Sequence, residues 1–378
     1  MWRSRKLARP EVAARKAGAG TTRPGAVRFA VWYVGLRMVR PFAVALLLLA
    51  AIVANAQPHL VFDHKIGADW PLDSNGWMSF VAISSDGQSV VGDAIALLKE
   101  ENHLGFWTFP DGKFLRSIDG FPVAISPDFR YIVLEKQVLD LKSGKPILTV
   151  AHKKDTMDTA AFSPDGELMA VKASAHIVKG QLSILRTADG SVVSSFGTRF
   201  ICAMAFSPDS QTIATGHWNN ITLWDVRSGE RLAVLMSPPR KVDPERYLRD
   251  GRYLGAVAVS PDGKLIAAGS DDGELQVWNF VSRKLMYATS LSWAGVTAVA
   301  FSPDSNLIAT GSYHDGTLRL VDTTTGKLLS EIQVSMFGVG AVAFSPDGKY
   351  LVTPSNDGML NNRKYSPGGT IRVFRVEE

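Results

Sequence analysis

Residues 256–279 read AVAVSPDGKLIAAGSDDGELQVWN and contain three short apolar segments separated by two tight turns. In the first turn, proline presets φ, and the aspartate and glycine that follow tolerate the later turn positions. The second turn has the sequence Ser270-Asp271-Asp272-Gly273, and a fourth apolar segment follows at residues 284–290. Four short strands joined by tight turns predict one small antiparallel sheet.

The Ser-x-Asp pattern of this unit recurs at a nearly constant interval. The seven anchor serines are Ser84, Ser126, Ser163, Ser207, Ser260, Ser302 and Ser345, with steps of 42, 37, 44, 53, 42 and 43 residues. An alanine lies two residues before each serine, and a larger apolar residue lies between them. A period near forty residues indicates one supersecondary unit copied several times. The pattern predicts an all-β fold, a seven-bladed β-propeller of four-stranded antiparallel blades.

A ring of blades explains how the units bury their apolar surfaces. Each sheet is apolar on both faces, and copies arranged radially cover each face with a neighbour. A linear solenoid is the alternative, but it needs polar capping units, which the repeats lack. The last unit has a third strand at residues 370–376 and no fourth strand after it. We expect residues 59–66 (HLVFDHKI) to supply that strand and close the ring, which removes exposed sheet edges.

Charge and cysteine content exclude several classes of protein. Residues 1–56 contain ten of the 41 basic residues and only one of the 36 acidic residues. Residues 57–378 therefore hold 31 basic and 35 acidic residues, which is a net charge of −4. The folded part therefore lacks the basic balance typical of nucleic-acid binding. Cys202 is the only cysteine, which excludes an intrachain disulfide and a cysteine-based zinc site.

Residues 1–56 are predicted to be a basic N-terminal region with a signal peptide, followed by the propeller at residues 57–378. The apolar run at 42–53 (FAVALLLLAAIV) precedes Ala54-Asn55-Ala56, a small-x-small cleavage pattern. We expect cleavage after Ala56 and an exported, periplasmic or otherwise extracytoplasmic protein. The alternatives are a membrane anchor at residues 42–54 and an arginine-rich transit peptide. Translation starts at either Met1 or Met38, and a start at Met38 would give a compact signal peptide.

Catalytic, cofactor-binding and metal-binding residues are not indicated. A catalytic serine is unique in an enzyme, whereas the Ser-x-Asp pair recurs in every unit and is typical of a turn former. The seven histidines are scattered without metal-ligand spacing, and no glycine-rich phosphate loop joins a strand to a helix. We therefore expect no enzyme activity and no cofactor.

Three longer segments interrupt the repeat, at residues 93–105, 237–252 and 356–369. They join a second strand to a third, or one unit to the next, and such loops emerge on the same face of a propeller. Binding loops on a rigid scaffold are a common functional device, although tolerated surface insertions are the alternative.

Aromatic residues also fall near this face. Trp77, Phe200, Tyr253, Trp293 and Phe337 lie seven to nine residues before their anchor serines. They either contact a partner or pack between blades. The residues predicted to bind a partner are Arg240, Arg246, Tyr247, Arg249, Arg363, Lys364, Tyr365, Trp293 and Phe337.

The repeats resemble those of the WD-repeat family of β-propellers. Trp224-Asp225 is the namesake dipeptide, and Trp278-Asn279 and Val321-Asp322 are partial copies. The Gly-His dipeptide typical of the family is nearly absent, with His152 as the only candidate. Six-bladed bacterial propellers also contain Ser-Pro-Asp-Gly, but seven anchors and Trp224-Asp225 argue against them.

The resemblance implies a non-enzymatic scaffold that presents its insertion-bearing face to a protein or peptide. The partners expected do not include nucleic acid, and contact with a membrane is expected only through an uncleaved N-terminal segment. The alternative is an exported enzyme or small-ligand sensor that uses the central channel.

Overall fold

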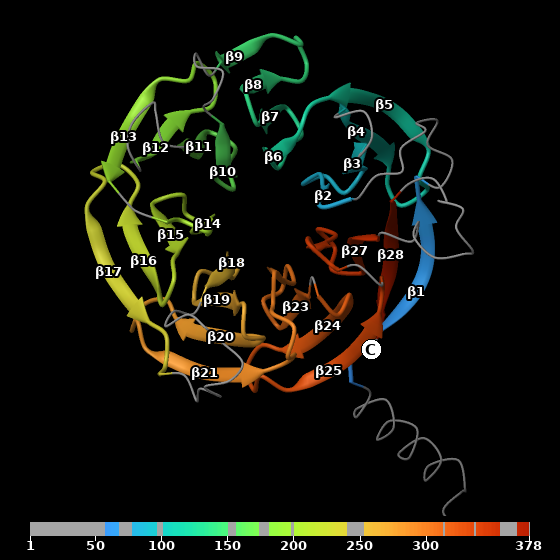
Figure 1. The fold of residues 1–378 in the computed structure, drawn as a ribbon, viewed down its shortest axis with the longest axis vertical. Helices are drawn as coiled ribbons and strands as arrows, with labels where there is room; N and C mark the ends of the chain where they lie inside the picture. Colours follow the sequence, from blue (N-terminus) through green and yellow to red (C-terminus); the bar gives the residue numbers. More distant parts are fainter. Residues whose placement is uncertain are drawn as a thin grey trace, which may run out of the picture. The chain divides into compact units, whose positions relative to one another are not determined.

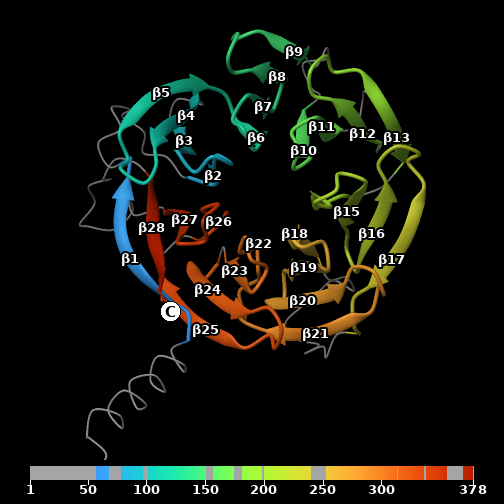
Figure 2. The ribbon, with the colours of Figure 1, turned by 180° about the vertical axis from the view of Figure 1, so that it is seen from behind.

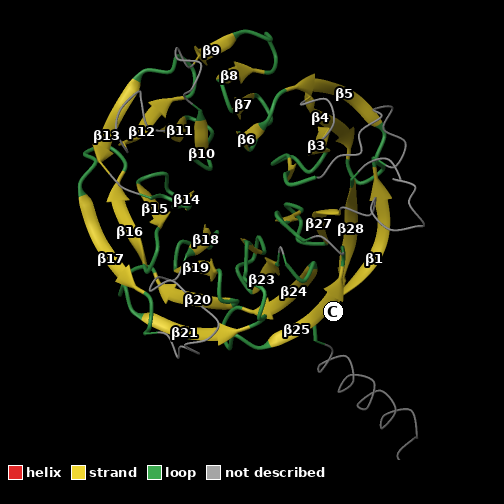
Figure 3. Cartoon of the chain, viewed as in Figure 1, coloured by secondary structure: helices red, strands yellow, loops and turns green. Residues whose placement is uncertain are grey.

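The seven repeats form seven four-stranded antiparallel sheets arranged in a ring around a central axis (Figure 1). The computed structural model describes residues 57–67, 78–96, 101–149, 156–173, 181–197, 200–239, 253–312, 314–335, 338–355 and 369–377. These residues form strands, turns and loops but no helix (Figure 3). None of them forms a helix long and apolar enough to cross a membrane, and the run at 42–53 lies outside them. The prediction of an all-β, seven-bladed propeller is confirmed.

Each blade runs from an innermost first strand to an outermost fourth strand. Blades one to three are β2 (Val81–Ile83), β3 (Ser89–Ala96), β4 (Glu101–Thr108) and β5 (Phe114–Asp119); β6 (Pro122–Ile125), β7 (Tyr131–Leu134), β8 (Gln137–Asp140) and β9 (Pro146–Thr149); and β10 (Met157–Phe162), β11 (Leu168–Ala173), β12 (Gln181–Arg186) and β13 (Val192–Gly197). Blades four to six are β14 (Ala203–Phe206), β15 (Thr212–Gly216), β16 (Asn220–Asp225) and β17 (Arg231–Met236); β18 (Leu254–Val259), β19 (Leu265–Ser270), β20 (Glu274–Asn279) and β21 (Leu285–Ser290); and β22 (Ala298–Phe301), β23 (Leu307–Gly311), β24 (Thr317–Asp322) and β25 (Leu328–Gln333).

The seventh blade joins the two ends of the propeller. It consists of β26 (Ala343–Phe344), β27 (Tyr350–Ser355), β28 (Thr370–Glu377) and β1 (His59–Ile66), in that order from the axis outward. β1 pairs antiparallel with β28 from His59↔Glu377 to Ile66↔Ile371. Figure 2 shows the two strands side by side at the perimeter. The predicted closing strand is confirmed at its predicted bounds.

The core is divided among the interfaces between blades. Seven apolar clusters occur, one between each pair of neighbouring blades, including the pair formed by the seventh and first blades. In one of them Ile266 and Trp278 pack against Ile221 and Leu223, and all four side chains are buried. This arrangement explains why one blade alone is unstable, because each of its two apolar faces is covered only by a neighbour.

One predicted insertion has a different structure. Residues 93–105 were expected to form a loop, but β3 and β4 pair as a long hairpin as far as Ala96↔Glu101. Buried Asp93 accepts hydrogen bonds from the Ser79 and Phe80 NH groups at 2.7 and 2.8 Å. The added residues therefore lengthen the strands of the first blade instead of leaving the sheet.

Candidate binding face

The strand order assigns every loop to one of two faces. Because successive strands are antiparallel, second-to-third-strand turns and blade-to-blade connections emerge together, and first-to-second-strand and third-to-fourth-strand turns emerge opposite them. We call the first side, with the connections at residues 120–121, 200–202 and 291–297, the insertion face. We call the second side, with the seven Ser-x-Asp turns, the anchor face.

The anchor face is built from one hydrogen-bonded turn repeated seven times. In every turn the serine hydroxyl donates to the aspartate carboxylate at 2.5–2.7 Å. The same hydroxyl accepts the NH group five residues after the serine at 2.9 Å. All seven serines are buried, so their hydroxyls are committed to the turns. These contacts support their interpretation as turn formers.

The exposed aromatic side chains of the described loops lie on the insertion face alone. Their exposed fractions are Phe121 36%, Phe200 68%, Trp218 45%, Tyr253 46% and Trp293 65%. In the described turns of the anchor face, the aromatic residues Phe109, Phe129 and Phe280 are buried or half-buried. Of the five aromatics predicted near the insertion face, Phe200, Tyr253 and Trp293 are therefore exposed, and Trp77 and Phe337 lie outside the described residues.

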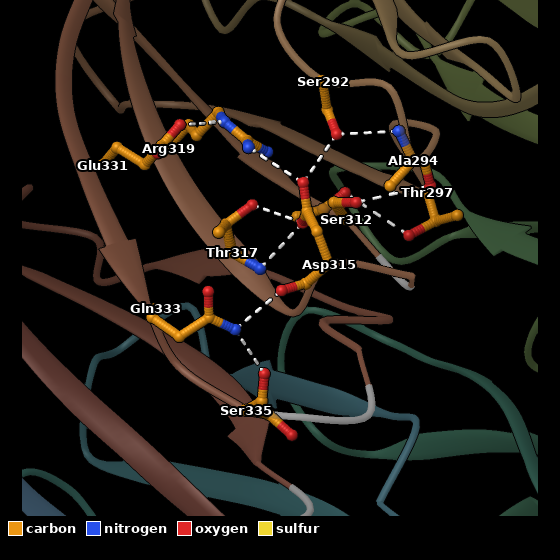
Figure 4. A network of polar contacts seen from close by, with 11 residues as sticks. Ser292, Ala294, Thr297, Ser312, Asp315, Thr317, Arg319, Glu331, Gln333 and Ser335 are labelled. Carbon is orange, nitrogen blue, oxygen red and sulfur yellow. Dashed lines mark hydrogen bonds and ion pairs between the residues drawn. The ribbon is translucent and has the colours of Figure 1, made fainter.

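Trp293 lies on a connection that hydrogen bonds hold on both sides. The neighbouring Ser292 hydroxyl donates to Asp315 at 2.6 Å and accepts the Ala294 NH at 2.9 Å (Figure 4). The NH groups of Leu291 and Val296 bond to carbonyls of the preceding blade at 2.9 and 2.8 Å. The backbone that carries Trp293 is therefore braced, so a partner need not order this loop on binding.

Gly273 is needed for this connection to approach the preceding blade. It has a φ of +83°, and an added Cβ would lie 1.7 Å from the Ser292 carbonyl oxygen. Only glycine permits both this conformation and this contact.

Asp315 is the electrostatic centre of the same loop. Its carboxylate also accepts hydrogen bonds from Thr317 and from Arg319, whose NH2 group lies 2.9 Å away. Arg319 is nearly buried and forms a second ion pair with Glu331 at 2.5 Å. Burial raises the pKa of Asp315, but hydrogen bonds from Ser292, Thr317 and Arg319 outweigh burial and hold the pKa well below its ordinary value. Asp315 thus braces this turn and the neighbouring connection.

A second group of aromatics lies at the insertion-face end of blade four and on the connections before and after this blade. The rings of Phe200 and Trp218 are 6.0 Å apart. Tyr253 follows nearby, since the NH of Leu254 donates to the carbonyl of His217, next to Trp218, at 3.1 Å. The NH of Tyr253 donates to Asp271 at 3.0 Å, so Asp271 braces this connection. Partial burial raises the pKa of Tyr253 to about 12.

In blade four, hydrogen bonds join the tryptophan of the Trp224-Asp225 dipeptide to the second strand. The Trp224 indole NH donates to the Thr215 hydroxyl at 2.8 Å, and that hydroxyl lies 2.9 Å from His217 Nε2. His217 belongs to the turn between the second and third strands, so a histidine of the same blade contacts the threonine. His152, the candidate predicted from sequence, lies outside the described residues.

Most of the residues predicted to bind a partner lie outside the part of the chain that the structure describes. They are Arg240, Arg246, Tyr247, Arg249, Phe337, Arg363, Lys364 and Tyr365. Trp293 is the described member of the set, and it is exposed on the predicted face. Trp218 and Phe121 were missed because they do not occupy the seven-to-nine-residue spacing used to find the others.

No group of three histidine, cysteine, aspartate or glutamate side chains in the described ranges has the geometry to hold a metal ion. Burial raises the pKa of the half-buried Cys202 thiol, which favours the less reactive protonated form. The described residues of the insertion face thus offer aromatic contacts and hydrogen bonds, which suit recognition.

The fold defines the class of protein as a seven-bladed β-propeller. Comparison with protein families finds the WD40 repeat (WD domain, G-beta repeat) in four places, at residues 189–225, 250–279, 288–322 and 326–361. The first match runs from the outer strand of one blade through the three inner strands of the next. The chain therefore contains WD40 repeats within a seven-bladed β-propeller, as the Ser-x-Asp and Trp-Asp patterns predicted.

The curated relatives share only parts of their length with this chain. Telomerase protein component 1 of Mus musculus is 25% identical over 56% of this chain and 8% of its own length. An uncharacterized WD repeat-containing protein of Synechocystis is 27% identical over 40% of each chain. Actin-interacting protein 1-2 of Arabidopsis thaliana is 28% identical over 46% of this chain and 26% of its own length. The chain thus spans less than half of each of these relatives.

Proposed function

We propose that this protein is a non-enzymatic scaffold that binds a protein or peptide partner through its insertion face. The observation that carries the proposal is the restriction of exposed loop aromatics to this face among the described residues. Aromatic side chains dominate the energetics of protein interfaces because they bury large areas at low entropy cost. WD40 propellers typically act as interaction scaffolds, and one relative is named for its interaction with actin.

We propose further that the protein acts outside the cytoplasm after export. The apolar run at 42–53 and the Ala54-Asn55-Ala56 pattern support a cleaved signal peptide. Cleavage after Ala56 would leave the closing strand intact, since β1 begins at His59. Mass measurement of the mature protein tests this part: an N-terminus at Gln57 is expected, and retention of residues 42–54 would contradict it.

Affinity capture with paired variants tests the binding face. The F200A/W293A variant removes two aromatic side chains from the insertion face, and we expect it to retain less than a tenth of the partner captured by the wild-type protein. The matched control V192A/V281A removes two side chains of similar exposure near the anchor face and should capture as much as wild type. Equal capture by wild type and F200A/W293A, or equal loss in both variants, would refute the assignment of the face.

A further inference from the structure

The second blade is the shortest of the ring, and its height creates a recess in the insertion face. Its second strand β7 has four residues, against eight in β3 and six in β11. All three strands begin five residues after their anchor serines, so their ends on the anchor face are level. At a rise of about 3.3 Å per residue, the second blade ends roughly 7 Å below the third and roughly 13 Å below the first.

Two pockets occupy the space above this blade. One, of about 550 Å³, is lined by residues of blades one and two, among them His103 and Asp119. The other, of about 480 Å³, is lined by blades two and three and by Cys202. Phe121 and Glu135 line both. We call this continuous depression the blade-two notch; it leads from the outer strand of blade one toward the first strands of blades three and four.

Backbone hydrogen bonds fix the floor of the blade-two notch. The Glu135 NH donates to the Phe121 carbonyl at 3.0 Å, and the Glu135 carbonyl accepts the Met157 NH at 2.8 Å. The Gly120 NH donates to the Asn102 carbonyl at 2.7 Å. These contacts join three consecutive blades, so the notch is preformed and a ligand need not order its floor.

The lining of the notch combines one exposed aromatic ring with acidic side chains. The described lining residues include three carboxylates, those of Asp119, Glu135 and Asp158, and one ammonium group, that of Lys136. The Asp158 carboxylate accepts a hydrogen bond from the Thr156 hydroxyl at 2.6 Å. Asp119 is 89% exposed and is held at 2.7 Å from His103 Nδ1. Lys136 Nζ lies 3.9 Å from Glu135 Oε1, and an exposed ion pair at this distance contributes little. A guanidinium can form paired hydrogen bonds to the Glu135 carboxylate, which a lysine ammonium cannot. The Phe121 ring lies between the two halves.

We propose that the blade-two notch binds an extended peptide segment that carries an arginine next to an apolar residue. The proposal rests on the protein-binding function proposed above and gives the chemistry of one part of the partner. Negative charge attracts the guanidinium, whose planar fork forms paired hydrogen bonds to carboxylates and stacks on aromatic faces. The continuous depression suits an extended chain, and Phe121 supplies the apolar contact.

A decapeptide array tests this inference on the full chain. The two central positions are varied through all residues in an uncharged glycine-serine background, and the bound labelled protein is quantified. We expect peptides with arginine beside leucine to bind the wild-type protein at least tenfold more tightly than the same peptides with glutamine in place of arginine. The E135Q/D158N variant, which keeps side-chain shape, should lose this preference, and F121A should weaken both peptides.

The control is E230Q/D111N, which removes two exposed carboxylates from the anchor face and should keep the preference. Absence of an arginine preference, its survival in E135Q/D158N, or its loss in the control would overturn the proposal. Competition by free agmatine as strong as that of the peptides would overturn the extended-segment part. F200A/W293A separates the two proposals, because it should lose partner capture while keeping the arginine preference.

Discussion

The two faces of this propeller use the same strands in different ways. On the anchor face, one serine–aspartate turn is repeated seven times with the same two hydrogen bonds. On the insertion face, the connections differ from blade to blade in length, in aromatic content and in bracing. The repeated turns stabilise the fold, whereas the exposed aromatic side chains of the described loops lie on the variable face, where we propose that a partner binds.

The hydrogen bonds of Asp315 on the insertion face stabilise the fold, so Asp315→Ala should produce the largest change in stability. The substitution leaves nearly buried Arg319 with only Glu331 as its charged partner, so we expect a loss of about 3–5 kcal/mol in the free energy of unfolding. Urea denaturation measures it. Glu331→Gln alters the more exposed partner and should cost less than about 1 kcal/mol. Equal costs for the two variants would mean that Asp315 does not hold this loop.

Ser260→Ala should affect stability but not binding, the opposite of F200A/W293A. The buried hydroxyl donates to Asp262 at 2.7 Å and accepts the Leu265 NH at 2.9 Å, so its loss should cost about 1–3 kcal/mol. Thermal unfolding and partner capture are measured on the same samples. A fall in capture by the folded variant would show that the two faces are not separate in function.

Acid should weaken the first anchor turn through Asp86. The hydrogen bond from Ser84 is the main reason that the pKa of Asp86 lies below its ordinary value. Stabilisation by a carboxyl with a lowered pKa is present above the unfolded value, near pH 4, and is lost as pH falls through the folded pKa. The stability gap between wild type and Ser84→Ala should therefore narrow from pH 5 to pH 2. A constant gap would show that the serine does not act through the charged aspartate.

Ser210→Gly should give the smallest effect, a gain in stability. Glycine follows the aspartate in four anchor turns, whereas Phe129, Ser210 and Ser305 hold this position with φ of 54°, 59° and 64°. A non-glycine residue in this conformation costs about 1–2 kcal/mol, part of which is offset here by the exposed Ser210–Asp165 hydrogen bond. We expect a gain below about 1 kcal/mol, read from the urea midpoint. A loss of stability would mean that this hydrogen bond outweighs the strain.

Features set by local sequence could be predicted, and those set by neighbouring blades could not. The bounds of β1 follow from a short segment that lies between Pro58 and the turn-forming residues 67–76, and the anchor turns follow from Ser-x-Asp. The segment 93–105 was wrongly expected to be a loop, because length alone does not distinguish a loop from a taller hairpin. The blade-two notch was missed although the 37-residue step from Ser126 to Ser163 is the shortest, since the depth of a recess depends on the heights of the flanking blades. The hydrogen bond from Ser292 to Asp315 joins the connection after blade five to a turn of blade six. Because it links two different repeats, no local sequence motif could predict it.

Site-specific photo-crosslinking in the native cell tests most directly whether the insertion face, and not the anchor face, binds a partner. A benzophenone side chain replaces Trp293 on the insertion face in one variant and Val281 on the anchor face in the other, where the native side chains are 65% and 80% exposed. We predict a discrete crosslinked protein from position 293 and none from position 281. A crosslink from position 281 with none from position 293 would contradict the account.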